Sequence, residues 1–143
     1  MEKYRYLEHT ADAKFESYGK TLEEAFENAT LAMANITADT STIEPKIKKE
    51  LSIKSENLGS LLYDWLERLI TLTELEGYLI NNIKIKKIKK KDDYYILAAT
   101  TQGDTYRQKY ELKTEVKAIT YNDMLIKQDK NTGIWKITAV VDI

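Results

Sequence analysis

Two stretches of helical periodicity set the limits on how this chain can fold. Apolar side chains recur every three or four positions in residues 22–36, and a broader apolar stripe does the same in residues 58–70. Each stretch follows a segment in which apolar and polar residues alternate, and after Gly77 alternation is the main pattern left. The regular strand–helix alternation of a parallel doubly wound sheet is missing. The pattern therefore predicts an α+β fold, with two helices packed on one face of a largely antiparallel or mixed β-sheet.

Local signals predict where the two helices begin and end. Thr21 and Glu24 have the spacing of a capping box ahead of the first helix. Ser55 or Asn57 can cap the second helix, and Gly77 is suited to end it.

Alternating segments and turn residues predict the strands. A break in the alternation between Ile85 and Ile88 predicts a β-bulge. Gly103-Asp104 and residues 129–133 predict turns. The expected strands are residues 4–7, 13–18, 47–54, 83–89, 94–101, 106–112, 116–120, 124–128 and 134–143.

Length and composition exclude several classes of protein. A chain of 143 residues has the usual size of one domain, which we expect to span residues 1–143. There are no cysteines, which excludes disulfides and thiolate metal sites. No apolar run approaches the roughly 20 residues of a membrane span, and the first residues lack the apolar core of a signal peptide. We therefore expect a cytoplasmic protein.

Carboxylates are the main candidates for chemistry. A glycine-rich phosphate loop and a nucleophile elbow are both missing, and His9 is the only histidine, more suited to a structural hydrogen bond than to a metal site. Asp12 follows His9-Thr10-Ala11 between two expected strands, and Asp142 adjoins the terminal carboxylate of Ile143. If these groups meet, they can hold a hard divalent cation. Spacing alone favours a plainer interpretation, in which the chain end is solvated and Asp12 caps a turn.

A run of lysines between residues 84 and 91 has two interpretations. Together with Tyr94 and Tyr95 it could bind RNA through phosphates and stacking. Lysine-rich strands more often protect a sheet edge against pairing with another sheet, and this interpretation is favoured from the sequence.

Several short motifs, in order along the chain, resemble those of the archease family. The segment Tyr6-Leu7-Glu8-His9-Thr10-Ala11-Asp12 and residues 19–29 resemble the family's start. Residues 58–66 are similar to its second-helix segment, Glu115-Val116-Lys117-Ala118-Ile119-Thr120-Tyr121 to its late motif, and residues 135–143 to its ending. One departure is Asn122, where many relatives have histidine.

The resemblance implies a function that composition does not. Archeases are accessory proteins rather than enzymes: they activate the RNA-splicing ligase that joins a 3′-phosphate end to a 5′-hydroxyl end in tRNA splicing. They promote guanylylation of the ligase from GTP, and they bind a divalent cation, usually calcium. Carried over to this chain, the metal ligands are Asp12, Asp142 and Ile143, and the important lysine is Lys117. RNA contact is expected to be indirect.

Two other classes of function stay open at this stage. The chain could be a metal-dependent hydrolase or nuclease that uses Asp12 and Asp142, although it lacks a cluster of histidines to act as general base. It could also be a general chaperone or scaffold without metal chemistry.

Overall fold

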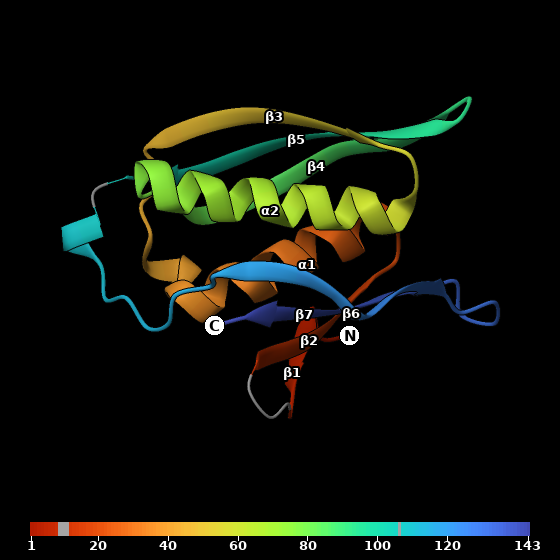
Figure 1. Cartoon of the computed structure of the whole chain (residues 1–143), viewed down its shortest axis with the longest axis horizontal. Coiled ribbons are helices and arrows are strands. Elements are labelled where there is room, and N and C mark those ends of the chain that lie inside the picture. Colours follow the sequence, from red (N-terminus) through yellow and green to blue (C-terminus); the bar gives the residue numbers. More distant parts are fainter. Residues whose placement is uncertain (9–11, 106) are drawn as a thin grey trace.

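A computed structural model of the chain describes residues 1–8, 12–105 and 107–143. The strands form two antiparallel sheets, and both helices lie between them (Figure 1). The predicted α+β class, with helices packed on antiparallel strands, is confirmed. The division into two sheets was not predicted, because alternation shows which residues form strands but not which strands pair.

The first sheet joins the two ends of the described chain. It has four strands in the order β1–β2–β7–β6. These are β1 (Tyr4–Leu7), β2 (Asp12–Gly19), β7 (Trp135–Asp142) and β6 (Ala118–Gln128). Since β7 pairs with both β2 and β6, the last strand of the chain lies in the interior of the sheet.

The second sheet is built from the middle of the chain. It has three strands in the order β3–β5–β4: β3 (Ile47–Ser55), β5 (Tyr94–Asp104) and β4 (Leu79–Lys91). The predicted bulge is confirmed, because the register of β4 against β5 shifts between Ile85 and Lys87. Another irregularity lies in β6, between Thr120 and Leu125, and the two strands predicted over residues 116–120 and 124–128 are one strand.

Helix α1 (Leu22–Thr37) begins where the sequence predicts. The Thr21 hydroxyl accepts a hydrogen bond from the Glu24 amide at 3.0 Å. The returning bond differs in detail from the expected box, since the Glu24 carboxylate accepts from the amide of Lys20 at 2.9 Å. The first bond satisfies an amide group that a helix start leaves without a partner, and the second ties the residue before the cap to the first turn.

Helix α2 (Leu58–Glu76) is fixed at both ends by local chemistry. Asn57 and Ser60 form a reciprocal capping box at its start. Gly77 ends it in the left-handed conformation with φ of 70°, which glycine adopts without a steric cost. Neither helix is long and apolar enough to cross a membrane within the described part of the chain.

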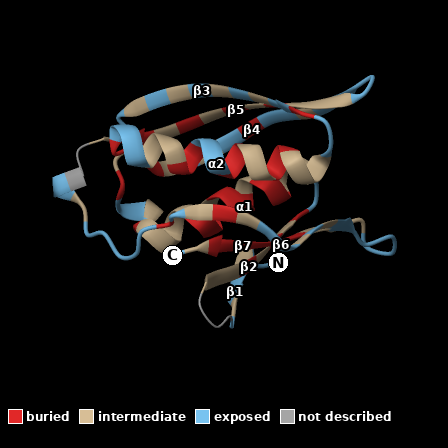
Figure 2. Cartoon of the chain, in the orientation of Figure 1, coloured by how far each residue is buried: buried red, intermediate tan, exposed pale blue. Residues whose placement is uncertain are grey.

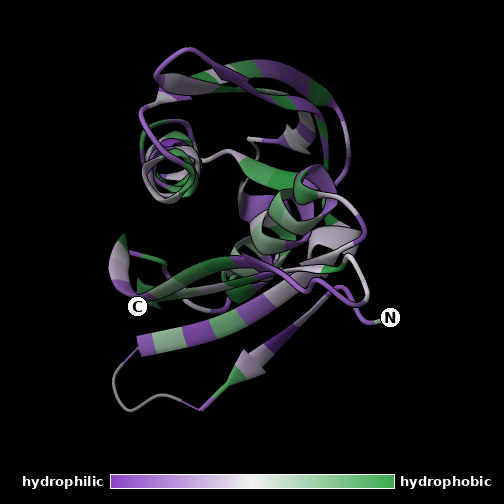
Figure 3. Ribbon diagram, turned by 90° about the vertical axis from the view of Figure 1, so that its right-hand side faces the viewer, coloured by the Kyte–Doolittle hydropathy of each residue, from purple (hydrophilic) through white to green (hydrophobic). Residues whose placement is uncertain are grey.

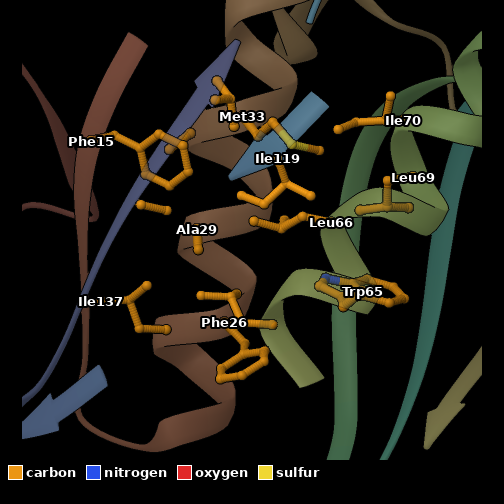
Figure 4. Packing of buried hydrophobic residues seen from close by; sticks show 14 of the residues in the cluster. Phe15, Phe26, Ala29, Met33, Trp65, Leu66, Leu69, Ile70, Ile119 and Ile137 are labelled. Atoms are coloured by element: carbon orange, nitrogen blue, oxygen red, sulfur yellow. The ribbon is translucent and has the colours of Figure 1, made fainter. Parts of the chain in front are cut away.

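The core lies on the helices and the inner faces of both sheets (Figures 2 and 4). Phe15 and Ile137 reach it from the first sheet, and Phe26, Trp65 and Leu66 come from the helices; all are fully buried. The Trp65 indole donates to the hydroxyl of Thr30 at 2.8 Å, so its one polar group is satisfied inside the core.

The prediction of a turn at Gly103-Asp104 is wrong, because both residues belong to β5. A Cβ on Gly103 would lie 1.9 Å from the carbonyl oxygen of Leu79. This glycine therefore permits a close approach between β5 and the start of β4, which a sequence pattern cannot distinguish from a turn.

The prediction of a strand over residues 106–112 is also wrong for residues 107–112, while residue 106 lies outside the described part of the chain. Residues 107–109 form the short helix η2 (Arg107–Lys109), and no regular structure follows until β6. Residues 107–117 lead to the first sheet. The amides of Lys113 and Thr114 donate to the carbonyls of Thr37 and Ile36 at the end of α1, at 2.8 and 3.3 Å. These amides satisfy the helix end instead of a sheet.

Candidate metal-binding edge

The strand register brings two predicted ligands together. Asp12 is the first residue of β2 and Asp142 the last of β7, and the two face each other directly in the antiparallel pair. Residues that face each other in this way have Cβ atoms about 4.5–5.5 Å apart and side chains on the same face. We call Asp12, Asp142, Ile143 and Lys117 the carboxylate edge.

This edge lies on the outer face of the first sheet. Burial alternates along β2, with Phe15 and Ser17 buried towards α1 and Lys14 and Glu16 on the opposite side. Asp12 has the same parity as Lys14, and both Asp12 and Asp142 are half-buried. Their carboxylates therefore point away from the core, where an ion and its water ligands can reach them.

Lys117 and Ile143 lie beside Asp142. The backbone amide of Lys117 donates to the carbonyl of Asp142 at 2.8 Å, just before β6 begins with Ala118 opposite Asp142. The Lys117 side chain is exposed. Ile143 follows directly and is 41% exposed. All four predicted site residues thus meet at one corner of the first sheet, although they come from three separate parts of the chain.

The bulge in β6 adds two residues that the sequence did not single out. It holds Asp123 with a positive φ of 55°, and the Asp123 carboxylate lies 3.3 Å from the ammonium group of Lys14. Lys14 lies two residues beyond Asp12 on the same face of β2. The carboxylate edge therefore has a lysine neighbour that is already paired with a different carboxylate. The extra residues between Thr120 and Leu125 leave no pattern in the sequence from which the contact between Asp123 and Lys14 could be predicted.

The donor set suits a hard cation. Carboxylate oxygens bind calcium and magnesium, and two carboxylates that face each other across strands repel unless a cation lies near them. No group of three or more His, Cys, Asp or Glu side chains close enough to share a metal occurs among the described residues. The edge can thus supply two side-chain carboxylates, and the other ligands have to be main-chain or terminal oxygens and water. His9, in the predicted loop motif, lies outside the described residues.

Asp39 has a structural role. Its carboxylate accepts from the amide and the hydroxyl of Ser41, at 3.0 and 2.7 Å, and caps the short helix η1 (Thr40–Thr42). The bond from the Ser41 hydroxyl is the main reason that the pKa of Asp39 lies below its ordinary value. Asp39 therefore acts as a helix cap and is not part of the carboxylate edge.

Comparisons with known proteins agree across the whole length of the chain. The model of the Archease protein family (MTH1598/TM1083) matches residues 4–143. A protein archease from Methanosarcina mazei is 41% identical over 143 residues, covering 99% of this chain and 97% of that protein. One from Pyrococcus furiosus is 41% identical over 144 residues, covering all of both chains.

Solved structures give the same result. The solution structure of Methanobacterium thermoautotrophicum protein 1598 has a TM-score of 0.85 and 39% identity, with all of both chains covered. The crystal structure of an archease and possible chaperone from Thermotoga maritima has a TM-score of 0.61 and covers 96% of this chain and 94% of that one. At 23% identity this second likeness shows the fold alone. The family match, the relatives and the first of these structures together show that the chain belongs to the archease family.

Proposed function

We propose that this protein is an accessory factor that binds a divalent cation and activates an RNA-splicing ligase by promoting its guanylylation from GTP. The observation that supports the proposal is the register that sets Asp12 opposite Asp142, with the amide of Lys117 bonded to Asp142. The family supplies the expected partner, and the carboxylate edge supplies a surface with suitable chemistry.

In this proposal Asp12, Asp142 and the carboxylate of Ile143 hold the cation, calcium being the expected one. The cation supplies charge neutralisation at a point where carboxylates would otherwise repel each other. Lys117, exposed beside the edge, is suited to contact a phosphate or a carboxylate of the ligase. The protein itself performs no bond chemistry: its residues bind and orient the partner so that guanylylation proceeds faster.

Cation binding is tested first without the ligase. Calcium should raise the melting temperature of the wild-type protein, because an ion that binds only the folded state stabilises it. The shift should disappear in Asp12→Asn and Asp142→Asn. Asp93→Asn, at the exposed tip between β4 and β5, is the matched control and should keep the shift. An unchanged calcium shift in Asp12→Asn would remove this edge as the cation site.

Ligase activation is tested with radiolabelled GTP and the cognate ligase, following the covalent ligase–GMP product. We expect at least roughly tenfold slower adduct formation with Asp12→Asn, Asp142→Asn or Lys117→Ala, which corresponds to about 1.4 kcal/mol of lost stabilisation. Lys127→Ala, an exposed lysine at the far end of β6, should behave as wild type. Full activation by Asp12→Asn would contradict the proposal, and so would turnover of RNA by the protein alone with calcium, which would indicate a hydrolase.

A further inference from the structure

The outer face of the second sheet is strongly basic. Hydropathy alternates along its strands (Figure 3), and burial and register place most apolar residues on the inner side and most polar ones on the outer side. The outer set includes many lysines on the two flanking strands: Lys48, Lys54, Lys84, Lys86, Lys87, Lys89 and Lys91. Glu50 is the one exposed carboxylate that the described strand residues contribute to this face, because Asp104 at the end of β5 is buried. We call this surface the lysine face. The chain as a whole has a net charge of −1, so the positive charge is local.

The bulge in β4 increases the density of charge. Ile85 faces Ala99 on the inner side, and the next paired residue, Lys87, faces Ala98 on the outer side. Lys86 falls within the bulge and is exposed, as is Lys87. The ammonium group of Lys86 lies 3.2 Å from the Glu50 carboxylate on β3, across the central strand. The bulge therefore places Lys87 on the outer face. Strict alternation from Ile85 would have turned Lys87 towards the helices.

Edge protection explains these lysines only in part. β4 is an edge strand, as expected, but glutamates of α1 already accept hydrogen bonds from two of its amides. The Ile85 amide donates to the Glu27 carboxylate at 2.7 Å, and the Ile88 amide donates to Glu23 at 3.2 Å. These contacts already hinder pairing with another strand around residues 85–88, so edge protection is not the full explanation of the lysines on the adjoining face.

The centre of the lysine face is uncharged, and most of its side chains are shorter than lysine. The outward residues of β5 include Ile96, Ala98, Thr100 and Gln102, so longer lysines stand on both sides of a lower strip. Tyr94 adds one aromatic ring, which the Lys54 ammonium group approaches to 4.0 Å from the ring centroid. Protein–protein interfaces are depleted in lysine and enriched in large apolar anchors, whereas this face is rich in lysine and has Ile96 as the one aliphatic residue larger than alanine among its described strand residues. A polyanion fits it better than a protein surface does.

We propose that the lysine face binds the sugar–phosphate backbone of RNA. Outward side chains two positions apart on a strand are about 6.6 Å apart, so Lys87, Lys89 and Lys91 form a row of point charges suited to successive phosphates. The inference that this face binds a polyanion does not depend on the proposal that the protein activates a ligase. The choice of RNA over DNA rests on the proposed function, because the expected partner joins RNA ends.

The experiment measures the anisotropy of a fluorescent single-stranded RNA at several salt concentrations, with DNA of the same sequence and a polyglutamate peptide alongside. We compare wild type with the triple variant Lys87→Gln, Lys89→Gln, Lys91→Gln. The control carries the same charge change at exposed lysines elsewhere: Lys20→Gln, Lys127→Gln, Lys130→Gln. Losing three phosphate contacts should lower the slope of log K against log salt by about 2 and weaken binding by more than roughly tenfold at low salt.

Several outcomes would overturn the proposal. These are undetectable RNA binding by wild type at low salt, equal losses in the two triple variants, tighter binding of DNA than of RNA, or retention of the acidic peptide in place of RNA. The calcium shift and basal ligase guanylylation should be unchanged in the Lys87, Lys89 and Lys91 variant. Failure of RNA binding and failure of the carboxylate edge are therefore distinguishable.

Discussion

The Tyr18 hydroxyl, on the outer face of the first sheet, donates a hydrogen bond to the carboxylate of Glu16 at 2.8 Å. This bond is the main reason that the pKa of Glu16 lies below its ordinary value of 4.5, and the ammonium group of Lys136, 3.4 Å away, acts in the same direction. Burial, followed by the bond to Glu16, raises the pKa of Tyr18 to about 12. The lowered pKa of Glu16 favours its carboxylate, and the raised pKa of Tyr18 favours its neutral hydroxyl. These are the two states that the hydrogen bond between them requires.

Replacing Tyr18 by phenylalanine should raise the pKa of Glu16 towards 4.5. A carboxyl whose folded-state pKa is lowered stabilises the fold above its unfolded pKa, and this contribution is lost as the pH falls through the folded pKa. The Tyr18→Phe variant should therefore lose less stability than wild type below pH 4.5. Carboxyl NMR titration and urea unfolding at several pH values measure the two effects. Tyr95→Phe, in the second sheet, is the control, and an unmoved Glu16 pKa would contradict the assignment.

Residue types could be predicted at the carboxylate edge, but their contacts could not. The lack of cysteine and the single histidine point to oxygen ligands, and the family resemblance singles out Asp12, Asp142 and Lys117. Their proximity depends on a pairing between the start and the end of the chain, and no local pattern specifies such a register. The contact between Lys14 and Asp123 depends in addition on a bulge, so it was missed.

At the scale of elements, the edge of β4 shows how a helix can close a sheet. Two carboxylates on successive turns of α1, from Glu23 and Glu27, accept hydrogen bonds from amides of β4 on either side of its bulge. A helix residue thus takes the place that a further strand would fill.

Replacing Glu27 by alanine should expose the amide of Ile85 and cost about 1–3 kcal/mol of unfolding free energy, the typical penalty for a polar group left without its partner. Urea unfolding measures the cost. Light scattering should show more self-association, and hydrogen exchange at the Ile85 amide should be faster. Glu27→Gln retains an oxygen acceptor and should stay close to wild type. If alanine and glutamine behave alike, the hydrogen bond is not what protects this edge.

The helices and most strands could be predicted from periodicity, because their apolar faces pack against a core. The two errors both concern the passage between sheets. Gly103 reads as a turn but permits close contact with Leu79, and residues 107–112 resemble a strand but no strand pairs with them. In each case the decisive partner, the start of β4 or the end of α1, is distant in sequence.

At the scale of the whole molecule, the helices connect the two sheets. α1 contacts β2 on one side and β4 on the other, and α2 contacts β6 and β3 (Figures 1 and 3). The two sheets do not pair with each other at any strand edge within the described chain. We therefore expect the sheets to unfold together, because each relies on the same helices for its apolar face.

Replacing the fully buried Leu66 by alanine should destabilise the protein by about 2–5 kcal/mol, because it leaves a cavity between the layers. Hydrogen exchange should show a similar loss of protection in both sheets, with urea unfolding as the measure of total stability. Leu75→Ala, at a position that is 79% exposed on the same helix, should change little. Loss of protection confined to one sheet would show that the layers unfold separately.

The interior position of β7 has a consequence for how the protein is made. The ribosome synthesises β2 before both helices and the whole second sheet. It synthesises β7, the neighbour of β2, only after them. During that interval the nascent β1–β2 hairpin carries an unpaired row of amides and carbonyls. Strand edges left open in this way are prone to pairing with other chains. Synthesis of β7 therefore ends the interval in which this edge of β2 is open to pairing with other chains.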